Sequence, residues 1–450
     1  MAVSISPLDN RYAKKVEHFA NIFNESNLNK TRTLVEIEWL IYLCSRLTPT
    51  FPKISQSSIK KLRNIYENFS ISDAKQIKQI EKTTNHDVKA IEYFVRNKIK
   101  SDKTLMMYEN YIHFGLTSED INSTSYALMI NNALKIIHKE YTDSLKLIKN
   151  LSLKGKNIPL LARTHGQPAS PSTFGKEFKV FESRLHSQLK DLPSKKVLGK
   201  WGGASGNFHT FVITNSKINW IRESKNFFQL LSLPLNEITT QIEPHDCIAD
   251  LSHQMIRCNN ILLDLVKDIW LYIANDLFIL KKKDKEVGSS TMPHKVNPID
   301  FENAEGNLGL ANSLLDFFAN KLTQSRLQRD LSDSTVLRNF GMAFGYISLA
   351  LTSINNGLHK LQINRIASQE ELDQNWQILA EPLQIILKLE GYTDPYNMVK
   401  KYTRGAKMDK QDYLDFVNNL AISNKSKELL LSLTPSNYIG LAETISSLKL

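Results

Sequence analysis

Cysteine, glycine and proline are all scarce in this chain of 450 residues. The three cysteines, Cys44, Cys247 and Cys258, form no CxxC pair, so we expect reduced thiols and neither disulfides nor a zinc site. The 17 glycines and 14 prolines concentrate in a few short segments, which leaves long stretches free to form helices.

Long hydrophobic runs are also missing. The most apolar window, Ile261 to Leu280, is interrupted by charged residues, and no run reaches the roughly 18 residues that a membrane span needs. The first residues, MAVSISPLDNRY, show no signal-peptide pattern. We therefore expect a cytoplasmic protein with no membrane partner.

Several catalytic signatures are absent. The sequence has no GxSxG nucleophile elbow, no Walker-type phosphate loop, no GxGxxG motif and no HExxH motif. These absences count against hydrolase, nucleotide-kinase, dehydrogenase and metallohydrolase functions. We expect neither a cofactor nor a metal.

Positive charge is in excess, with 57 Lys and Arg against 46 Asp and Glu and a net charge of +11. The basic residues are spread along the chain and do not form one stripe with interleaved aromatic residues, the pattern typical of nucleic-acid binding. We expect no nucleic-acid partner. A basic protein attracts anionic small molecules through its long-range field.

Helical periodicity dominates what is present and predicts an all-α fold. One helix is expected near Thr117, where Asp120 completes a capping-box-like pattern, and another at Ser170, with proline in the first helical position. A third is expected from Asp246 to Leu280. Further helical patterns cover 302–322 and 335–361.

Helices of this length cannot bury their apolar stripes inside one compact chain. They need a bundle, to which other subunits can contribute. We predict an N-terminal helical domain at 1–111, a central long-helix bundle at 112–361 and a C-terminal helical domain at 362–450.

Short polar segments interrupt the helical pattern. They are TTNHDVKA (83–90), HFGLTSED (113–120), RTHGQPASPST (163–173), TTQIEPHD (239–246), GSSTMPHKVNPID (288–300) and QRDLSDSTVLRN (328–339). Most of them, taken singly, fit an ordinary role, because Ser, Thr, Asn and Asp cap helices and form turns. Arg329 or Arg338 alone is typical of a surface ion pair.

The segment GSSTMPHKVNPID is harder to explain by structure alone. Gly288 gives backbone freedom and two prolines stiffen the path, while Lys295 and Asn297 point to the same side of an extended segment. A loop of this kind could close over an anion. Its ammonium, amide and N–H groups could stabilise the oxyanion of a deprotonated serine.

GSSTMPHKVNP resembles the GSSxMPxKxNP signature of the fumarase/aspartase superfamily. TTNHDVKAIEYF, HFGLTSEDIN, RTHGQPASPSTFGKE, TTQIEPHD and RDLSDSTVLRN resemble the bacterial adenylosuccinate lyase family, and the resemblance runs from SPLDNRY to TPSNYIG. It implies an all-α fold of three domains, a homotetramer with a core of about 20 helices, and active sites shared between subunits.

The resemblance also implies a reaction, the β-elimination of fumarate in purine biosynthesis. Adenylosuccinate would give AMP, and the succinyl-aminoimidazole-carboxamide ribotide would give the carboxamide ribotide on the route to IMP. Both substrates are nucleotide-like polyanions, which suits a basic protein with several arginines.

The roles of individual residues follow from the same resemblance. Ser289 is the expected general base, and His165, oriented by Glu302, is the expected general acid on the leaving nitrogen. Lys295 and Asn297 are expected to stabilise the carbanion intermediate. The other expected substrate contacts are Arg11, Tyr12, Asn85, His86, Asp87, His113, Thr117, Ser118, Gln241, Ser290, Val296, Asn303, Arg329, Ser334, Thr335 and Arg338. His86 is also expected to assist the acid chemistry.

Two alternatives stay open. One is a superfamily lyase with another succinyl substrate, which the nucleotide product would distinguish. The other is a non-enzymatic protein on the same scaffold, structural or nucleic-acid-binding. The presence of Ser289, His165 and Lys295 counts against it.

Overall fold

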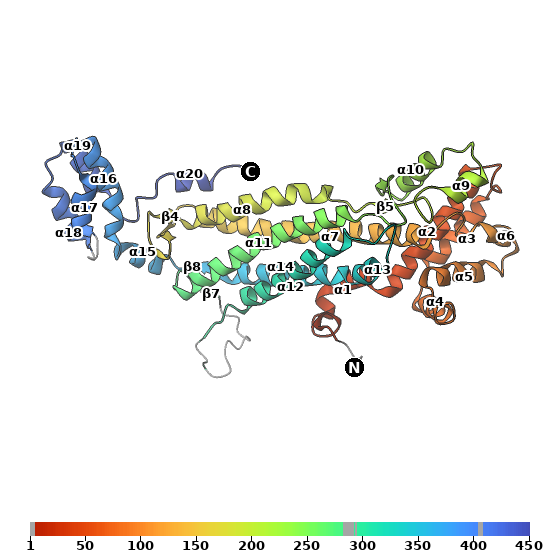
Figure 1. Ribbon diagram of the computed structural model, residues 1–450. Coiled ribbons are helices and arrows are strands. Elements are labelled where there is room, and N and C mark those ends of the chain that lie inside the picture. The colour runs from red at the N-terminus through yellow and green to blue at the C-terminus, as the bar shows by residue number, and fades with distance from the viewer. Residues whose placement is uncertain (1–4, 282–291, 293–294, 404–407) are drawn as a thin grey trace. The chain divides into compact units, whose positions relative to one another are not determined.

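The structure is a computed structural model that describes residues 5–281, 292, 295–403 and 408–450 (Figure 1). The chain divides into two compact units. The first unit comprises Met1–Glu140, Leu189–Asn259 and Gly306–Ala350, and the second comprises Tyr141–Gln188, Asn260–Glu305 and Leu351–Leu450. Most residues are helical and the strands are short, so the predicted all-α fold is confirmed. The division into three domains stays a prediction.

The first unit begins with a group of packed helices. They are α1 (Ala13–Phe23), α2 (Glu25–Arg46), α3 (Gln56–Glu67), α4 (Ile71–Thr84), α5 (Asp87–Ile99) and α6 (Lys103–Met106). The same unit contains α9 (His209–Thr214), α10 (Trp220–Leu230), α13 (Ser332–Leu337) and the parallel pair β5 (Gly199–Lys200) and β6 (Leu235–Asn236).

An aromatic cluster forms the core around α2. Trp39 is fully buried, and its ring centre lies 5.0 to 5.8 Å from those of Tyr42, Trp201, Phe211 and Phe227. Aromatic pairs at these separations add to the hydrophobic stabilisation. The Trp39 indole donates to the carbonyl of Phe114 at 3.0 Å. The core therefore anchors the polar segment 113–120.

The long helices contribute residues to both units. They are α7 (Ser118–Lys154), α8 (Phe174–Asp191), α11 (Asp246–Ala274), α12 (Ile299–Leu322) and α14 (Phe340–Lys360). Within each unit, segments of them lie side by side (Figure 1). In the first unit Asn259 of α11 donates to Asn312 of α12 at 2.8 Å. In the second unit Ser353 of α14 donates to Asn303 of α12, also at 2.8 Å.

The second unit also holds short antiparallel strand pairs. They are β1 (Pro159–Leu160) with β4 (Ser172–Thr173), β2 (Arg163–Thr164) with β3 (Gln167–Pro168), and β7 (Phe278–Leu280) with β8 (Leu361–Ile363). Its C-terminal helices are α15 (Arg365–Asp373), α16 (Ala380–Leu389), α17 (Pro395–Thr403), α18 (Lys410–Asn418), α19 (Asn424–Ser432) and α20 (Ala442–Ser446). Leu383, Leu387, Tyr413 and Leu430 are fully buried in their core.

Three predicted helices differ in the structure. The helical pattern predicted at 335–361 is divided between α13 (Ser332–Leu337) and α14 (Phe340–Lys360), and Leu361 belongs to β8. The helix expected at Ser170 begins at Phe174, because Ser172–Thr173 pair with a strand and Thr173 caps the helix by accepting the Lys176 N–H at 3.1 Å. The helix expected to reach Leu280 ends at Ala274. The residues after it turn and form β7, which pairs with β8 more than 80 residues later in the chain.

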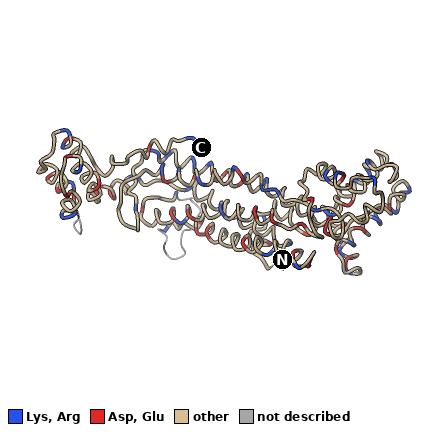
Figure 2. The backbone as a smooth tube through the Cα atoms, turned by 45° about the horizontal axis from the view of Figure 1, so that its top comes forward, with Lys and Arg blue, Asp and Glu red and all other residues tan. Residues whose placement is uncertain are grey.

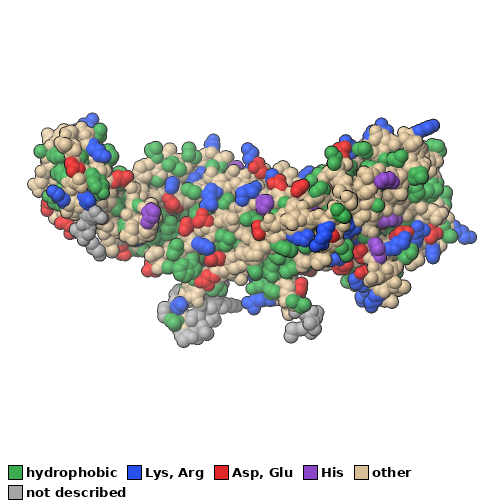
Figure 3. Space-filling model, viewed as in Figure 1, with side chains coloured by type: hydrophobic (Ala, Val, Ile, Leu, Met, Phe, Trp, Pro, Cys, Tyr) green, Lys and Arg blue, Asp and Glu red, His purple; other side chains and the backbone are tan. Residues whose placement is uncertain are grey.

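Charge is mixed over both units. Figure 2 shows lysine and arginine spread over the described chain with acidic residues between them, and Figure 3 shows charged and hydrophobic side chains interspersed on the visible face. In the part of the chain that the structure describes, no helix is both long enough and apolar enough to cross a membrane.

Candidate active site

The segment Asn85–Asp87 forms the turn between α4 and α5. Asn85 ends α4 in the left-handed conformation (φ 49°), and His86 caps α5, because its Nδ1 accepts the Lys89 N–H at 3.1 Å. The proton of the neutral ring therefore sits on Nε2, which lies 3.4 Å from the Ser118 hydroxyl. His86 and Ser118, both expected substrate contacts, thus meet in the structure.

Asp87 is held between two arginines. Its Oδ2 lies 2.7 Å from Arg32 Nη2 and 2.9 Å from Arg338 Nη2. Burial alone would raise the pKa of Asp87, but the two guanidinium groups and the Val88 N–H outweigh burial and lower the pKa. Arg338 also pairs with Glu25 at 2.8 Å. The carboxylates of Glu25 and Asp87 therefore orient Arg338, which is an expected phosphate contact.

Arg32 is a member of this group that the sequence reasoning missed. It is fully buried in α2, and its Nε donates to Asn122 Oδ1 at 2.9 Å. Its position along the helical pattern of the sequence could have indicated its burial. It lies on a helix between Leu28 and Val35, both of which are buried. A buried arginine requires paired acceptors, so it points to a polar group inside the unit.

The start of α7 is fixed by a buried ion pair. The backbone N–H of Thr117 donates to Asp120 Oδ2 at 2.8 Å, which confirms one of the two contacts of the predicted capping-box-like pattern. Asp120 Oδ1 lies 2.7 Å from Lys200 Nζ, and both side chains are fully buried. Lys200 also donates to the Gly203 carbonyl at 2.6 Å. The segment that carries Thr117 and Ser118 is therefore held rigidly.

His113 faces a buried carboxylate. Its Nδ1 lies 2.6 Å from Glu36 Oε1, which belongs to α2. Burial alone would lower the pKa of His113, but the charge and hydrogen bond of Glu36 outweigh burial and raise the pKa. The raised pKa favours the imidazolium form, which suits the expected contact near a phosphate.

Gln241, Glu119 and Arg329 form a second polar group. Arg329 donates to Gln241 Oε1 at 3.1 Å and to Glu119 Oε1 at 3.0 Å, and Gln241 donates to the Ala204 carbonyl at 2.9 Å. Burial raises the pKa of Glu119, while the charge of Arg329 acts in the opposite direction. Glu119 lies in the first turn of α7 and is not among the expected site residues; the structure assigns it a buried contact with Arg329.

The segment 328–339 continues into α13, which carries Ser334 and Thr335. The Ser334 N–H donates to Asp333 Oδ1 at 2.7 Å. His245 lies close to the same carboxylate, with Nε2 3.8 Å from Asp333 Oδ2. The segments 239–246 and 328–339 therefore meet.

At the start of α1, the Arg11 guanidinium lies 5.5 Å from the centre of the Tyr12 ring.

His165 occupies the tip of the β2–β3 hairpin in the second unit. His165 and Gly166 both have positive φ (55° and 74°), as a tight two-residue hairpin turn requires. An ion pair between Arg163 and Glu371 anchors the base of the hairpin. The side chain of His165 is exposed at the tip.

The segment before α12 carries the expected substrate contacts Lys295, Val296 and Asn297. Lys295 is exposed, and its N–H donates to the Met292 carbonyl at 3.1 Å. Ser289 and Ser290 lie outside the described residues.

Glu302 and Asn303 lie near the start of α12. Glu302 Oε1 accepts the indole N–H of Trp270 at 3.1 Å, and Asn303 accepts the Ser353 hydroxyl. The expected pairing of Glu302 with His165 stays a prediction.

The expected site residues are thus divided between the units. The first unit brings together the segments 83–90, 113–120, 239–246 and 328–339. The second unit carries His165, Lys295, Val296, Asn297, Glu302 and Asn303. Among the described residues, no group of three or more His, Cys, Asp and Glu could hold a metal ion.

Comparison with known proteins identifies the family. A family model described as "Lyase" matches residues 10–311, and one described as "Adenylosuccinate lyase C-terminal" matches residues 325–439. The adenylosuccinate lyases of Legionella pneumophila (strain Corby) and Escherichia coli (strain K12) are each 45% identical to this chain, over 98% of it and 97% of their own length. The chain belongs to the adenylosuccinate lyase family. It is a carbon–nitrogen lyase.

Solved structures share the fold of this lyase. A fumarate lyase from Mesorhizobium sp. BNC1 superposes with a TM-score of 0.79 at 17% identity, over 96% of each chain. A 3-carboxy-cis,cis-muconate lactonizing enzyme from Pseudomonas putida gives a TM-score of 0.79 at 19% identity, over 96% of this chain and 95% of its own. At these identities the likeness concerns the fold alone.

Proposed function

We propose that this lyase eliminates fumarate from adenylosuccinate, releasing AMP, and from the succinyl-aminoimidazole-carboxamide ribotide, releasing the carboxamide ribotide. The observation that carries the proposal is the 45% identity to adenylosuccinate lyases over 98% of the chain. The reaction would take place in the cytoplasm, without a cofactor.

The arginines of the first unit support phosphate binding. Arg338 is held by Glu25 and Asp87, yet its side chain remains 35% exposed, so a charged and oriented guanidinium is accessible to a ligand. Arg329 is held in the same way by Glu119 and Gln241. Guanidinium groups oriented in advance bind phosphate oxygens at a low entropic cost. In this proposal Arg11, Tyr12, Ser334 and Thr335 complete the phosphate and ribose contacts.

The turn that carries His86 supports recognition of the base or of the succinyl group. Asn85, His86 and Asp87 lie at the start of α5, and the His86 ring meets Ser118. In the proposal this turn contacts the substrate together with Thr117 and Gln241. His113, with its raised pKa, would lie near the phosphate.

The elimination itself needs a base, an acid and support for a dianion. In the proposed mechanism Ser289 removes the proton next to a carboxylate, the carbon–nitrogen bond breaks, and His165 protonates the leaving nitrogen. The Lys295 ammonium and the Asn297 amide stabilise the aci-carboxylate intermediate. Ser290, Val296 and Asn303 would contact the substrate, and Glu302 would orient the His165 ring.

We also propose a homotetramer whose active sites are shared between subunits. The expected site residues are divided between the two units of one chain, with Arg329 and Arg338 in the first and His165 and Lys295 in the second. In this proposal several chains contribute them to one site. Leu310 and Phe317 are seven residues apart on α12 and therefore share a face, and they are 52% and 51% exposed. Exposed apolar side chains on one helix face are typical of an oligomer contact.

Product identification tests the proposed activity. Purified protein is incubated with each of the two substrates, and the products are separated by chromatography. We expect fumarate from both, with AMP from adenylosuccinate and the carboxamide ribotide from the other substrate. Folded protein that turns over neither compound, but cleaves argininosuccinate, malate or aspartate, would contradict the proposal.

A further inference from the structure

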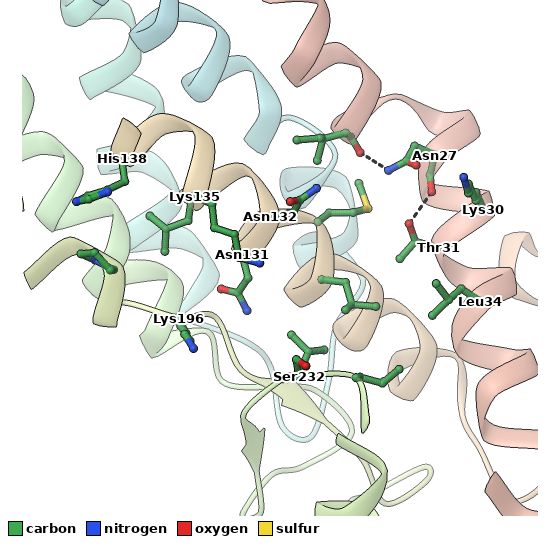
Figure 4. A pocket seen from close by; sticks show the side chains of 17 residues that line it. Asn27, Lys30, Thr31, Leu34, Asn131, Asn132, Lys135, His138, Lys196 and Ser232 are labelled. Carbon is green, nitrogen blue, oxygen red and sulfur yellow. Dashed lines mark hydrogen bonds between the residues drawn. The ribbon is translucent and has the colours of Figure 1, made fainter. Parts of the chain in front are cut away.

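A cavity of about 660 Å³ lies in the first unit, between α2 and α7 (Figure 4). In Figure 4, Asn27, Lys30, Thr31 and Leu34 line it from α2, and the facing wall comes from α7. Its volume is within the range of about 300–1,000 Å³ that is usual for small-molecule sites. None of its lining residues is among the expected substrate contacts.

The charged groups around this cavity are all basic. Lys30, Lys135 and Lys196 line it, and no Asp or Glu does. Among the described residues, none of these three ammonium groups has an ion-pair or hydrogen-bond partner. Lys30 lies on the α2 side of the cavity, and Lys135 and Lys196 lie on the other side (Figure 4), so the lining is positively charged and favours an anionic ligand.

The walls between the lysines are largely apolar. Leu34 comes from α2, Leu128 and Leu134 from α7, and Leu233 from the turn after α10. An inorganic ion would leave this apolar surface in contact with water. A ligand with an apolar body would cover it, which adds roughly 25 cal/mol for each Å² removed from water.

The cavity is built by contacts that do not need a ligand. The Asn131 side chain donates to the Val197 carbonyl and accepts the Val197 N–H, both at 2.8 Å, and so holds the segment that carries Lys196 against α7. On the opposite wall the Asn27 side chain donates to the Ile22 carbonyl at 2.8 Å. A site that is already formed loses little entropy when it binds.

We propose that this cavity binds a small organic anion, a carboxylate, sulfonate or phosphate with an aromatic or aliphatic body. The positive charge of Lys30, Lys135 and Lys196 attracts the anionic group, and the leucines contact the body. The proposal goes beyond the lyase activity and does not depend on it.

The test uses the full-length protein and the fluorescent probe 8-anilinonaphthalene-1-sulfonate, which combines a sulfonate with an aromatic body. We expect saturable binding that weakens as salt is added. The triple variant Lys30→Gln, Lys135→Gln, Lys196→Gln should raise the Kd of the probe at least tenfold. Lys139→Gln, an exposed change on α7 outside the cavity, should leave the Kd unchanged.

A second measurement locates the probe without any variant. Lysine acetylation is followed by mass spectrometry with and without the probe. We expect the probe to protect Lys30, Lys135 and Lys196 but not Lys139. An unchanged Kd in the triple variant, or equal protection of all four lysines, would overturn the proposal. Because neither readout is turnover, failure here is distinguishable from failure of the proposed activity.

Discussion

The buried arginine of α2 allows a sharp test of how the binding turn is held. Replacing Arg32 by Met keeps an unbranched side chain of similar length but removes the guanidinium. Two contacts are lost, one to Asp87 Oδ2 at 2.7 Å and one to Asn122 Oδ1 at 2.9 Å. Of its two arginine partners, Asp87 then keeps Arg338.

The size of the effect follows from burial. Removing one partner of a fully buried ion pair costs about 3–5 kcal/mol. Asp87 is 26% exposed and keeps Arg338, so we expect the free energy of unfolding to fall by about 2–3 kcal/mol. Arg63→Met is the matched control, because Arg63 contacts Glu38 at 2.8 Å but is 44% exposed. This control should lose less than about 1 kcal/mol.

The assay is equilibrium urea unfolding at one fixed protein concentration, since subunit association also changes apparent stability. Asp87→Asn and the double variant complete a double-mutant cycle. We expect a coupling energy of about 1–2 kcal/mol between Arg32 and Asp87. The reasoning is wrong if Arg32→Met costs no more than the Arg63 control, or if the coupling energy is near zero.

Three further predictions concern the reaction, pH and packing. Ser289→Ala should lower turnover by at least about 100-fold, while calorimetry still detects substrate binding; near-normal turnover would place the base elsewhere. The raised pKa of His113 means that its carboxylate contact stabilises the fold fully below about pH 6.5 and less as pH rises through the folded-state pKa. The stability difference between wild type and His113→Gln should therefore shrink at alkaline pH, and a constant difference would contradict this assignment. A Cβ on Gly357 would lie 2.6 Å from the Phe301 ring, so Gly357→Ala should cost about 1–2 kcal/mol in urea unfolding. Gly306→Ala, where a Cβ meets open space, should not destabilise the fold.

The long helices were predictable because their signal is local. The apolar period from Ile248 onward and the capping pattern at Thr117 both depend on residues within a few turns. The errors came from pairings between distant segments. The sequence pattern predicted that residues 278–280 continue α11. They form a strand that pairs with Leu361–Ile363 instead, and no local pattern indicates this pairing.

The candidate site shows the same limit. The segment around His86 was predictable as a polar interruption of the helical pattern, and so was the role of polar residues as caps. The residues that hold the segments together, Arg32 and Lys200, were not. Arg32 lies between two threonines and Lys200 between Gly199 and Trp201, so neither has a local pattern that marks it. The partner of each lies 55 or 80 positions away in the chain. Only the folded chain shows which carboxylate each one meets.

The central claim is a lyase site that combines residues from different chains. Subunit mixing tests this claim most directly. Ser289→Ala and His165→Ala proteins, each expected to be inactive, are mixed under conditions of demonstrated subunit exchange. Random mixing of equal amounts should restore about a quarter of wild-type activity, because each site needs an intact serine from one chain and an intact histidine from another. Mixing Ser289→Ala with the double variant should restore none. If the first mixture also stays inactive after exchange, the shared site is contradicted.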